Sequence, residues 1–212
     1  MPEILKVDIN ISEEAVFRKT AEILAVGGVI AYPTETFYGL GVDATNENAI
    51  RKIYDIKGRN FNNPISVIIG RKKDLKQLVK EIPATAIELL EEFWPGPLTI
   101  VFEASDKVSP LLTAKTNKIG IRISSNRGAT AIAQKLGRPL TATSANLSGA
   151  PECTNATEVA RQIGDKIDAI IDMGETPGGR GSTIIDVTVN PPNILREGII
   201  DRQFLDRYFI FQ

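Results

Sequence analysis

The sequence predicts an α/β fold in which helices flank a mixed sheet. Short apolar runs typical of strands alternate with stretches of helical periodicity along the whole chain, as expected of a sheet wrapped by helices. The length of 212 residues suits one domain with one sizeable core. No linker, internal repeat or low-complexity tract divides the chain. We therefore expect a single domain over residues 1–212, with a short C-terminal tail at 201–212.

The elements of the first half follow from periodicity and from residues that begin or end helices. Ser12 can cap a helix whose apolar residues recur on one face, and Gly27 can end it. Pro83 stands at a helix start, where proline is favoured. The expected order is helix 12–27, strand 28–32, helix 45–56, strand 65–69, a short basic helix 72–80, helix 84–93 and strand 98–102.

The second half continues the alternation. Asn126 can cap a helix, and glycines and polar residues mark the connections. We expect the tail to pack back on the body, because it ends in aromatic residues. The expected order is a loop over 104–118, strand 119–123, helix 127–136, strand 139–142, a polar loop 143–149, helix 156–164, strand 167–172, a glycine-rich loop 174–181, strand 182–188 and a short strand 194–197.

The stretch Tyr32–Gly41 lies between a predicted strand and a predicted helix, where ligands usually bind in an open α/β sheet. It holds two threonines, a carboxylate and two glycines, more than a plain connection needs. Residues 39–44 mimic the glycine fingerprint of dinucleotide-binding proteins. We reject that interpretation, because six residues separate the end of the strand from Gly39 and the helix begins only after the motif.

The counts of histidine and cysteine exclude much chemistry. The chain has no histidine and one cysteine, Cys153, so Ser-His-Asp and Cys-His catalysis and Cys/His zinc sites are excluded. No disulfide can form within the chain, the N-terminus lacks signal-peptide features and no apolar run approaches the ~20 residues of a membrane span, so we expect a cytoplasmic protein without membrane contact. The net charge of −1 gives no global attraction to nucleic acids. The remaining chemistry favours positioning and charge neutralisation, as in nucleotidyl transfer.

Two polar motifs allow a functional and a structural interpretation. Lys57-Gly-Arg59 places two cations at a helix end, which fits a phosphate clamp but also complementarity to the helix dipole. The segment 143–149 gathers three hydroxyls and an amide, which fits a nest for an anionic or nucleotide ligand but also a turn that satisfies its own backbone. Spacing alone does not decide between these interpretations.

Two arginines in predicted strands allow a similar choice. Arg122 interrupts an apolar strand, so it could face solvent or anchor a carboxylate or phosphate in a cleft. Arg196 has the same ambiguity. The glycine-rich loop 174–181 is not a Walker A loop, because the Lys-Ser/Thr ending is missing and a strand follows. We interpret it as a surface loop and keep Ser182, at the entrance of the next strand, as a candidate.

These motifs, in this order, resemble those of the YrdC-like family, the L-threonylcarbamoyladenylate synthases. The resemblance runs from about residue 12 to about residue 200, which would be the core of the domain. The matches are Tyr32-Pro-Thr-Glu-Thr-Phe-Tyr-Gly-Leu-Gly41, Lys57-Gly-Arg59 followed by Asn63-Pro64, Phe93-Trp-Pro-Gly-Pro-Leu-Thr99, the strand with Arg122, Ser144-Ala-Asn-Leu-Ser-Gly149, Ser182-Thr-Ile-Ile-Asp186 and Ile194-Leu-Arg196. The departures are Asn60, where many relatives have Pro, the end of strand 65–69, which lacks a frequent His, and Glu197, which replaces a Pro.

The resemblance implies a twisted α/β sheet with a large open cavity and a nucleotidyltransferase activity. Members of the family combine L-threonine, bicarbonate or CO2, and ATP into threonylcarbamoyl-AMP and pyrophosphate, the first step of N6-threonylcarbamoyladenosine formation in tRNA. The implied partners are these substrates and downstream proteins that transfer the threonylcarbamoyl group, while tRNA contact would be indirect. Mg²⁺ is expected to accompany ATP, with no protein-bound metal. Such a reaction joins two anions, so it needs cations rather than a histidine base.

The resemblance also implies roles for individual residues. Lys57 and Arg59 are the catalytic candidates. The ATP-binding candidates are Lys57, Arg59, Ser144, Asn146, Ser182 and Arg196. The threonine-binding candidates are Thr34, Arg122, Thr143 and Thr116, with Arg122 at the threonine carboxylate.

Two rival functions remain open at this point. One is a module that binds double-stranded RNA or tRNA without catalysis, which the near-neutral net charge disfavours. The other is an enzyme of the same fold that makes carbamoyl-adenylate from carbamoyl phosphate and ATP. Such domains normally belong to much longer chains with Cys-rich segments, which this sequence lacks.

Overall fold

The computed structural model describes residues 1–7 and 12–208. Its strands form one ten-stranded sheet in the order β1-β8-β2-β3-β7-β4-β6-β5-β9-β10. The strands are β1 (Glu3–Lys6), β2 (Ile30–Pro33), β3 (Tyr38–Gly41), β4 (Ser66–Ile68), β5 (Leu98–Glu103), β6 (Lys118–Arg122), β7 (Leu140–Ser144), β8 (Ala169–Asp172), β9 (Thr183–Asp186) and β10 (Asn193–Arg196). The helices are α1 (Glu13–Ala25), α2 (Glu47–Lys57), η1 (Lys72–Gln77), α3 (Ala84–Phe93), α4 (Pro110–Thr113), α5 (Arg127–Leu136), α6 (Ala156–Ile163), η2 (Gly164–Lys166) and α7 (Arg202–Leu205), where η marks a 3-10 helix.

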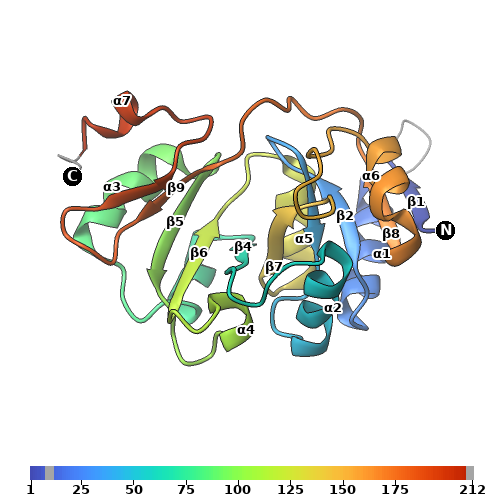
Figure 1. Ribbon diagram of the computed structural model, residues 1–212, viewed down its shortest axis with the longest axis horizontal. Helices are drawn as coiled ribbons and strands as arrows, with labels where there is room; N and C mark the ends of the chain where they lie inside the picture. Colours follow the sequence, from blue (N-terminus) through green and yellow to red (C-terminus); the bar gives the residue numbers. More distant parts are fainter. Residues whose placement is uncertain (8–11, 209–212) are drawn as a thin grey trace.

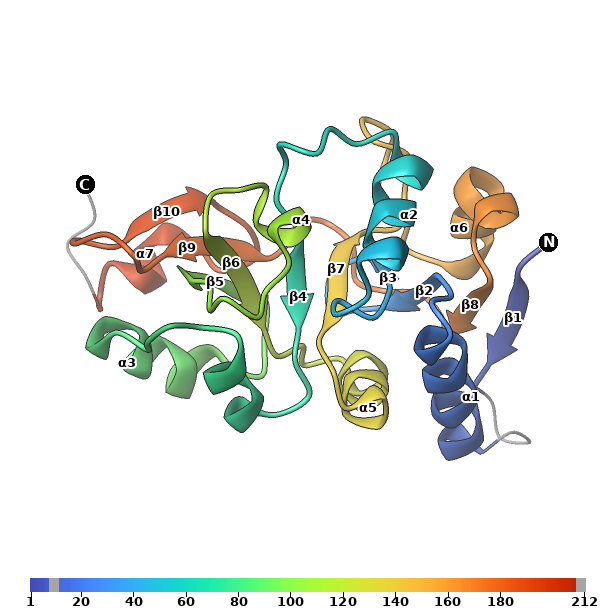
Figure 2. The same cartoon turned by 90° about the horizontal axis from the view of Figure 1, so that it is seen from below.

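The sheet is mixed, and helices cover both of its faces (Figure 1). β8 runs parallel to β1 and β2, and β4–β6 and β5–β9 are also parallel pairs. The other neighbouring pairs are antiparallel. Figure 2 shows α1, α3 and α5 on one side of the twisted sheet and α2 and α6 on the other. The predicted α/β class, with a mixed sheet flanked by helices, is confirmed.

Two apolar clusters fill the space between the sheet and the helices. Neighbouring residues of β2 divide between them, because successive side chains of a strand point to opposite faces. Ile30 and Tyr32 pack with residues of α1 and α5, whereas Ala31 packs in the cluster that includes α2 and α6. Both faces of the central strands are therefore buried, as expected where helices cover both sides.

Most predicted elements are present, and five short ones in the described part of the chain were missed, namely β1, β3, α4, η2 and α7. β1 is mostly exposed, so its sequence lacks the apolar signal of a buried strand. β3 contains two glycines, which are depleted in strands, and the stretch was interpreted as a connection. α4 lies within the predicted loop 104–118 and has only four residues. In addition, the basic helix predicted over 72–80 is the 3-10 helix η1, and β7 extends to Ser144 into the predicted polar loop.

The stretch singled out in the sequence is a β-hairpin formed by β2 and β3. Tyr32 lies opposite Gly39 in the antiparallel register. A Cβ atom at Gly39 would come within 3.0 Å of the Tyr32 ring, and one at Gly41 within 2.7 Å. The ring is fully buried, and its hydroxyl donates a hydrogen bond to the Thr141 carbonyl oxygen at 2.8 Å. The two glycines therefore make room for an aromatic ring, and no dinucleotide fingerprint is needed to explain them.

Residues 173–182 form a strap that connects β8 with β9, two strands far apart in the sheet order. In Figure 1 this segment runs across the top of the molecule. The Tyr38 hydroxyl donates to the Gly174 carbonyl oxygen at 2.8 Å, and the Gly178 N–H donates to the Thr36 carbonyl oxygen at 2.8 Å. Two hydrogen bonds thus hold the strap against the β2–β3 hairpin. The strap ends at Ser182, immediately before β9.

The described part of the predicted tail, residues 201–208, packs back on the body. Leu205 of α7 is fully buried, and the ring of Tyr208 lies 5.5 Å from the ring of Phe93. Residues 209–212 lie outside the described part of the chain. Among the described residues, no helix has the length and apolar character needed to cross a membrane.

Candidate active site

A pocket of about 190 Å³ lies among the β2–β3 hairpin tip, the loop after α2, the ends of several central strands, and the strap. Of the ten residues predicted to bind ligands, seven line it. They are Thr34, Arg59, Arg122, Thr143, Ser144, Ser182 and Arg196. The pocket is present, but the large open cavity expected from the resemblance stays a prediction. The roles of the individual residues also stay predictions.

Lys57, Asn146 and Thr116 do not line this pocket. Lys57 and Asn146 are buried behind its wall. Thr116 is exposed, and its hydroxyl donates to the Thr113 carbonyl oxygen at 2.6 Å, so it stabilises the turn before β6. The structure therefore divides the predicted residues into a lining set, a supporting pair and one outlying residue.

Lys57 is the last residue of α2, and Gly58 ends the helix in the left-handed conformation, with φ at 58°. The Lys57 ammonium group donates to the carbonyl oxygen of Ser144, to that of Asn146 at 2.7 Å, and to Asn146 Oδ1 at 3.0 Å. An ammonium group has three protons, so these contacts use all of them. Burial lowers the pKa of Lys57 to about 8, with Arg59 adding to the effect. Lys57 thus holds the segment 144–146 in place.

Asn146 completes this network with its side-chain amide. Its Oδ1 also accepts a hydrogen bond from Ser144 Oγ at 2.6 Å, and its Nδ2 donates to the Ala150 carbonyl oxygen at 2.6 Å. Because Ser144 lines the pocket and Asn146 does not, the network fixes the Ser144 side chain from behind. The segment 143–149 is therefore held by Lys57 of α2 from behind the pocket, and it is more than a turn whose polar groups bond only to one another.

Arg59 and Arg196 come from distant parts of the sequence, and both line the pocket. Arg59 Nη2 donates to the Pro64 carbonyl oxygen at 2.9 Å. Arg196 Nε and Nη2 donate to the Ser182 carbonyl oxygen at 3.1 and 2.8 Å, and Nη2 also contacts Ser182 Oγ at 3.1 Å. These bonds orient both guanidinium groups while leaving further N–H groups on each for an anion.

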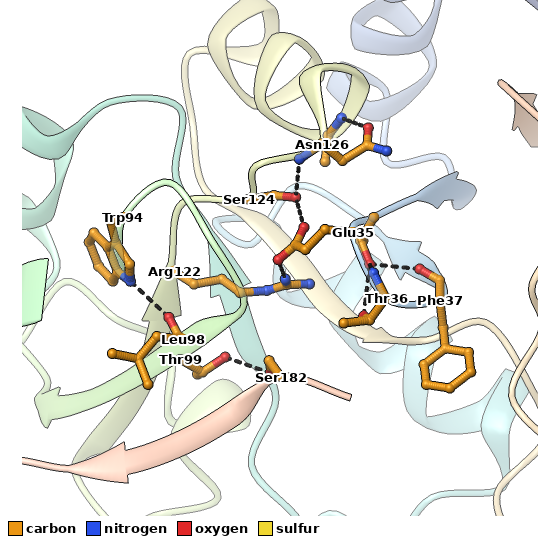
Figure 3. Close-up of polar contacts among 12 residues, drawn as sticks. Glu35, Thr36, Phe37, Trp94, Leu98, Thr99, Arg122, Ser124, Asn126 and Ser182 are labelled. Atoms are coloured by element: carbon orange, nitrogen blue, oxygen red, sulfur yellow. Dashed lines mark hydrogen bonds and ion pairs between the residues drawn. The ribbon is translucent and has the colours of Figure 1, made fainter. Parts of the chain in front are cut away.

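Arg122 is buried, with 6% of its surface exposed, so the solvent-facing interpretation of this residue is wrong. It forms an ion pair with Glu35, whose other oxygen accepts a hydrogen bond from Ser124 Oγ. Figure 3 shows the Arg122 side chain extending from β6 toward Glu35 at the hairpin tip. Arg122 still lines the pocket, so it can present its remaining donors there.

The hydroxyl group of Thr34 stabilises the turn of the hairpin. Its Oγ1 donates to the Phe37 carbonyl oxygen at 2.7 Å and accepts from the Thr36 N–H at 3.2 Å. The proton of this hydroxyl is therefore used within the tip, and one lone pair accepts the Thr36 N–H, which leaves at most one lone pair for a ligand donor. Thr143, on the neighbouring β7, lies opposite Leu40 of the hairpin and completes this side of the pocket.

Several lining residues were not predicted as ligand contacts. They include Tyr32, Thr36, Thr99 and Glu152. Thr99 had a visible signal, because it is the polar residue in the otherwise apolar run Leu98–Phe102. It is 2% exposed, and its hydroxyl lies 3.0 Å from Ser182 Oγ. Figure 3 marks this contact with a dashed line.

The charged lining of the pocket favours an anionic ligand. Three guanidinium groups and one carboxylate, that of Glu152, line it, although the whole chain has a net charge of −1. Cys153 is fully buried, and burial raises its thiol pKa to about 11, so it is no nucleophile at neutral pH. Among the described residues, no group of three or more His, Cys, Asp and Glu side chains could hold a metal ion. The site suits charge neutralisation and hydrogen bonding by hydroxyl groups.

Comparison with known proteins places the chain in a family. Residues 22–198 match the family model Sua5/YciO/YrdC, which carries the description "Telomere recombination". The chain is 42% identical to a threonylcarbamoyl-AMP synthase of Pyrococcus abyssi over 88% of its own length and 55% of that protein's length. It is 38% identical to a threonylcarbamoyl-AMP synthase of Vibrio parahaemolyticus, covering 86% of this chain and 98% of the relative.

The fold agrees with a solved structure of a relative. The crystal structure of Pyrococcus abyssi Sua5 complexed with L-threonine superposes with a TM-score of 0.92 at 38% sequence identity. The match covers 98% of this chain and 60% of that one. The chain thus spans little more than half the length of its Pyrococcus relative and nearly the full length of the Vibrio one.

Proposed function

Because the chain belongs to the Sua5/YciO/YrdC family, we propose that it makes threonylcarbamoyl-AMP from L-threonine, bicarbonate or CO2, and ATP. The observation that carries the proposal is the gathering of Arg59, Arg122 and Arg196 at one pocket. The relatives named threonylcarbamoyl-AMP synthase, and the relative complexed with L-threonine, support it. The activity is that of a nucleotidyltransferase, and we expect it to operate in the cytoplasm.

The chemistry has two steps. The amine of threonine attacks the carbon of CO2 and loses a proton, which gives a carbamate anion. A carbamate oxygen then attacks the α-phosphorus of ATP, the bond to the bridging oxygen breaks, and pyrophosphate leaves. Both reactants of the second step are anions, so cationic side chains that hold them together lower the barrier through positioning and charge neutralisation.

We assign the residues to two sides of the pocket. Arg59, Ser144, Ser182 and Arg196 contact ATP, and Lys57 and Asn146 support Ser144 from behind. Thr34, Thr143 and Arg122 contact threonine, with Arg122 at its carboxylate. Thr116 has the weakest support, since it lies outside the pocket lining.

Mg²⁺ enters this proposal with ATP. The lining carboxylate of Glu152 fits a cation that is held mainly by phosphate oxygens and water, which is the usual binding mode of Mg²⁺. The ion would supply further neutralisation of the phosphate charge. The product would pass to proteins that transfer the threonylcarbamoyl group to tRNA, so contact with tRNA itself would be indirect.

The test is an incubation with ATP, Mg²⁺, bicarbonate and L-threonine, followed by repeats with each component omitted. We expect pyrophosphate release only when all four are present. Release without threonine that depends on carbamoyl phosphate would support the carbamoyl-adenylate alternative instead. Salt-sensitive RNA binding with no ATP turnover would support the RNA-binding alternative.

A further inference from the structure

Glu35 is a carboxylate whose two oxygen atoms are both occupied by protein groups. It stands at the tip of the β2–β3 hairpin, and its side chain is 12% exposed. One oxygen pairs with Arg122 Nη1 and the other accepts the hydrogen bond of Ser124 Oγ. These partners lie on and just after β6, which β7 and β4 separate from the hairpin in the sheet. The carboxylate therefore bridges two elements that are not neighbours in the sheet.

The bridge has an inner and an outer side. Arg122 lines the pocket, whereas Glu35 and Ser124 do not. Glu35 therefore holds the guanidinium group from outside the pocket. A guanidinium group presents five N–H donors in a rigid planar fork, so holding one terminal nitrogen orients the others.

The outer side of the bridge, Glu35 and Ser124, is connected to the start of α5 by further hydrogen bonds. Ser124 is 1% exposed, and its Oγ accepts a hydrogen bond from the Asn126 N–H at 3.1 Å. Asn126 Oδ1 caps α5 by accepting from the N–H groups of Gly128 at 2.9 Å and Ala129 at 3.3 Å. Figure 3 shows this chain of contacts leading from Arg122 through Glu35 to the start of α5. Connected, partly buried hydrogen bonds of this kind leave little freedom to the side chains that form them.

We propose that Glu35 is a positioning residue for the amino acid substrate: it fixes the Arg122 guanidinium so that its free N–H groups meet the substrate carboxylate. This inference rests on the proposed function, because it takes threonine as the ligand of Arg122. Glu35 has a second, opposing effect, since its negative charge repels a bound carboxylate. The positioning effect outweighs the repulsion. A buried guanidinium group that loses its counter-charge is no longer held in the orientation that two-point recognition of a carboxylate requires.

The test compares Glu35→Gln, which keeps the shape and removes the charge, with the wild-type protein. We expect KM for threonine to rise about 10-fold or more, with a smaller change in KM for ATP. The dissociation constant of threonine, measured by calorimetry without bicarbonate, should rise by the same factor. Glu35→Asp, which keeps the charge, should recover part of the affinity. Ser124→Ala should give a smaller loss in the same direction.

The control is Glu14→Gln, which removes a carboxylate from an exposed ion pair with Lys135, away from the pocket. It should leave both constants unchanged. Wild-type protein that binds no threonine would contradict the proposed function itself. If wild-type protein binds threonine, a folded Glu35→Gln variant with equal or tighter threonine affinity would overturn the role of Glu35. If thermal unfolding shows that Glu35→Gln is not folded, unchanged threonine affinity in Ser124→Ala would overturn it instead.

Discussion

Lys57 shows how burial changes the meaning of a charged residue. The sequence predicts a cation beside phosphate, and the structure places the ammonium group against three oxygen atoms of Ser144 and Asn146. Lys57 would then contribute to a phosphate site indirectly, by holding Ser144 in its place in the pocket lining. This distinction could not be predicted from the motif, because the motif does not say which protein atoms the side chain meets.

Replacing Lys57 with Met, which has similar length and no charge, should disconnect the segment 144–146 from α2. We expect a folded protein whose pyrophosphate release is reduced about 100-fold, because small displacements of binding groups carry large kinetic costs. The control is Lys52→Met, since Lys52 also lies on α2 but donates to the Gly27 carbonyl oxygen at 2.7 Å, away from the pocket. Near wild-type release by Lys57→Met would refute the supporting role of Lys57.

The pH dependence of pyrophosphate release should reflect the protonation of Lys57. The pKa of Lys57 is lowered from 10.5 to about 8, so the folded protein loses this proton as pH rises through about 8. A neutral amine has two donors in place of three, so pyrophosphate release should fall above that pH, and it should not do so in Lys57→Met. Between about pH 8 and 10.5 the unfolded chain binds more protons at Lys57 than the folded one, so this group makes folding more favourable as pH rises through that window. A pKa near 10.5, measured by NMR, would contradict this expectation.

At the scale of elements, hydrophobic periodicity predicted the helices and strands that bury one clear apolar face. α5 was predicted with its bounds and its Asn126 cap, because the sequence carries both the stripe and the capping residue. β3 was missed, because its glycines oppose a strand locally and become favourable only beside the Tyr32 ring. Tertiary packing decides the structure at such positions, and a local pattern does not contain it.

This packing makes Gly41 a test of the hairpin. A Cβ atom at Gly41 would lie 2.7 Å from the Tyr32 ring and 2.9 Å from Leu140 Cδ1, and both side chains are fully buried. Gly41→Ala should therefore lower the free energy of unfolding by about 1–3 kcal/mol, measured by urea denaturation. Gly164→Ala is the matched control, because its Cβ would meet Pro2 at an ordinary 3.4 Å. Equal stability of Gly41→Ala and wild-type protein would contradict the packing described for the hairpin.

At the scale of the whole molecule, the pocket depends on the order of strands in the sheet. Residues far apart in sequence, such as Thr34, Arg122 and Arg196, meet because β2–β3, β6 and β10 converge on the pocket and the strap crosses the sheet. The sequence could suggest each residue as a candidate, since polar groups in apolar strands are visible. It could not predict Glu35 as the partner of Arg122, because that contact depends on a sheet order that alternation of elements leaves open.

The most direct test of the central claim is the identity of the nucleotide product. With isotope-labelled bicarbonate, L-threonine, ATP and Mg²⁺, mass spectrometry should detect a nucleotide with the mass of AMP joined to threonine and CO2 less one water, carrying the label. Equal amounts of this product and pyrophosphate should form. Release of pyrophosphate with only unlabelled AMP, or formation of ADP in place of AMP derivatives, would contradict the proposal that this pocket joins a threonine carbamate to the α-phosphate of ATP.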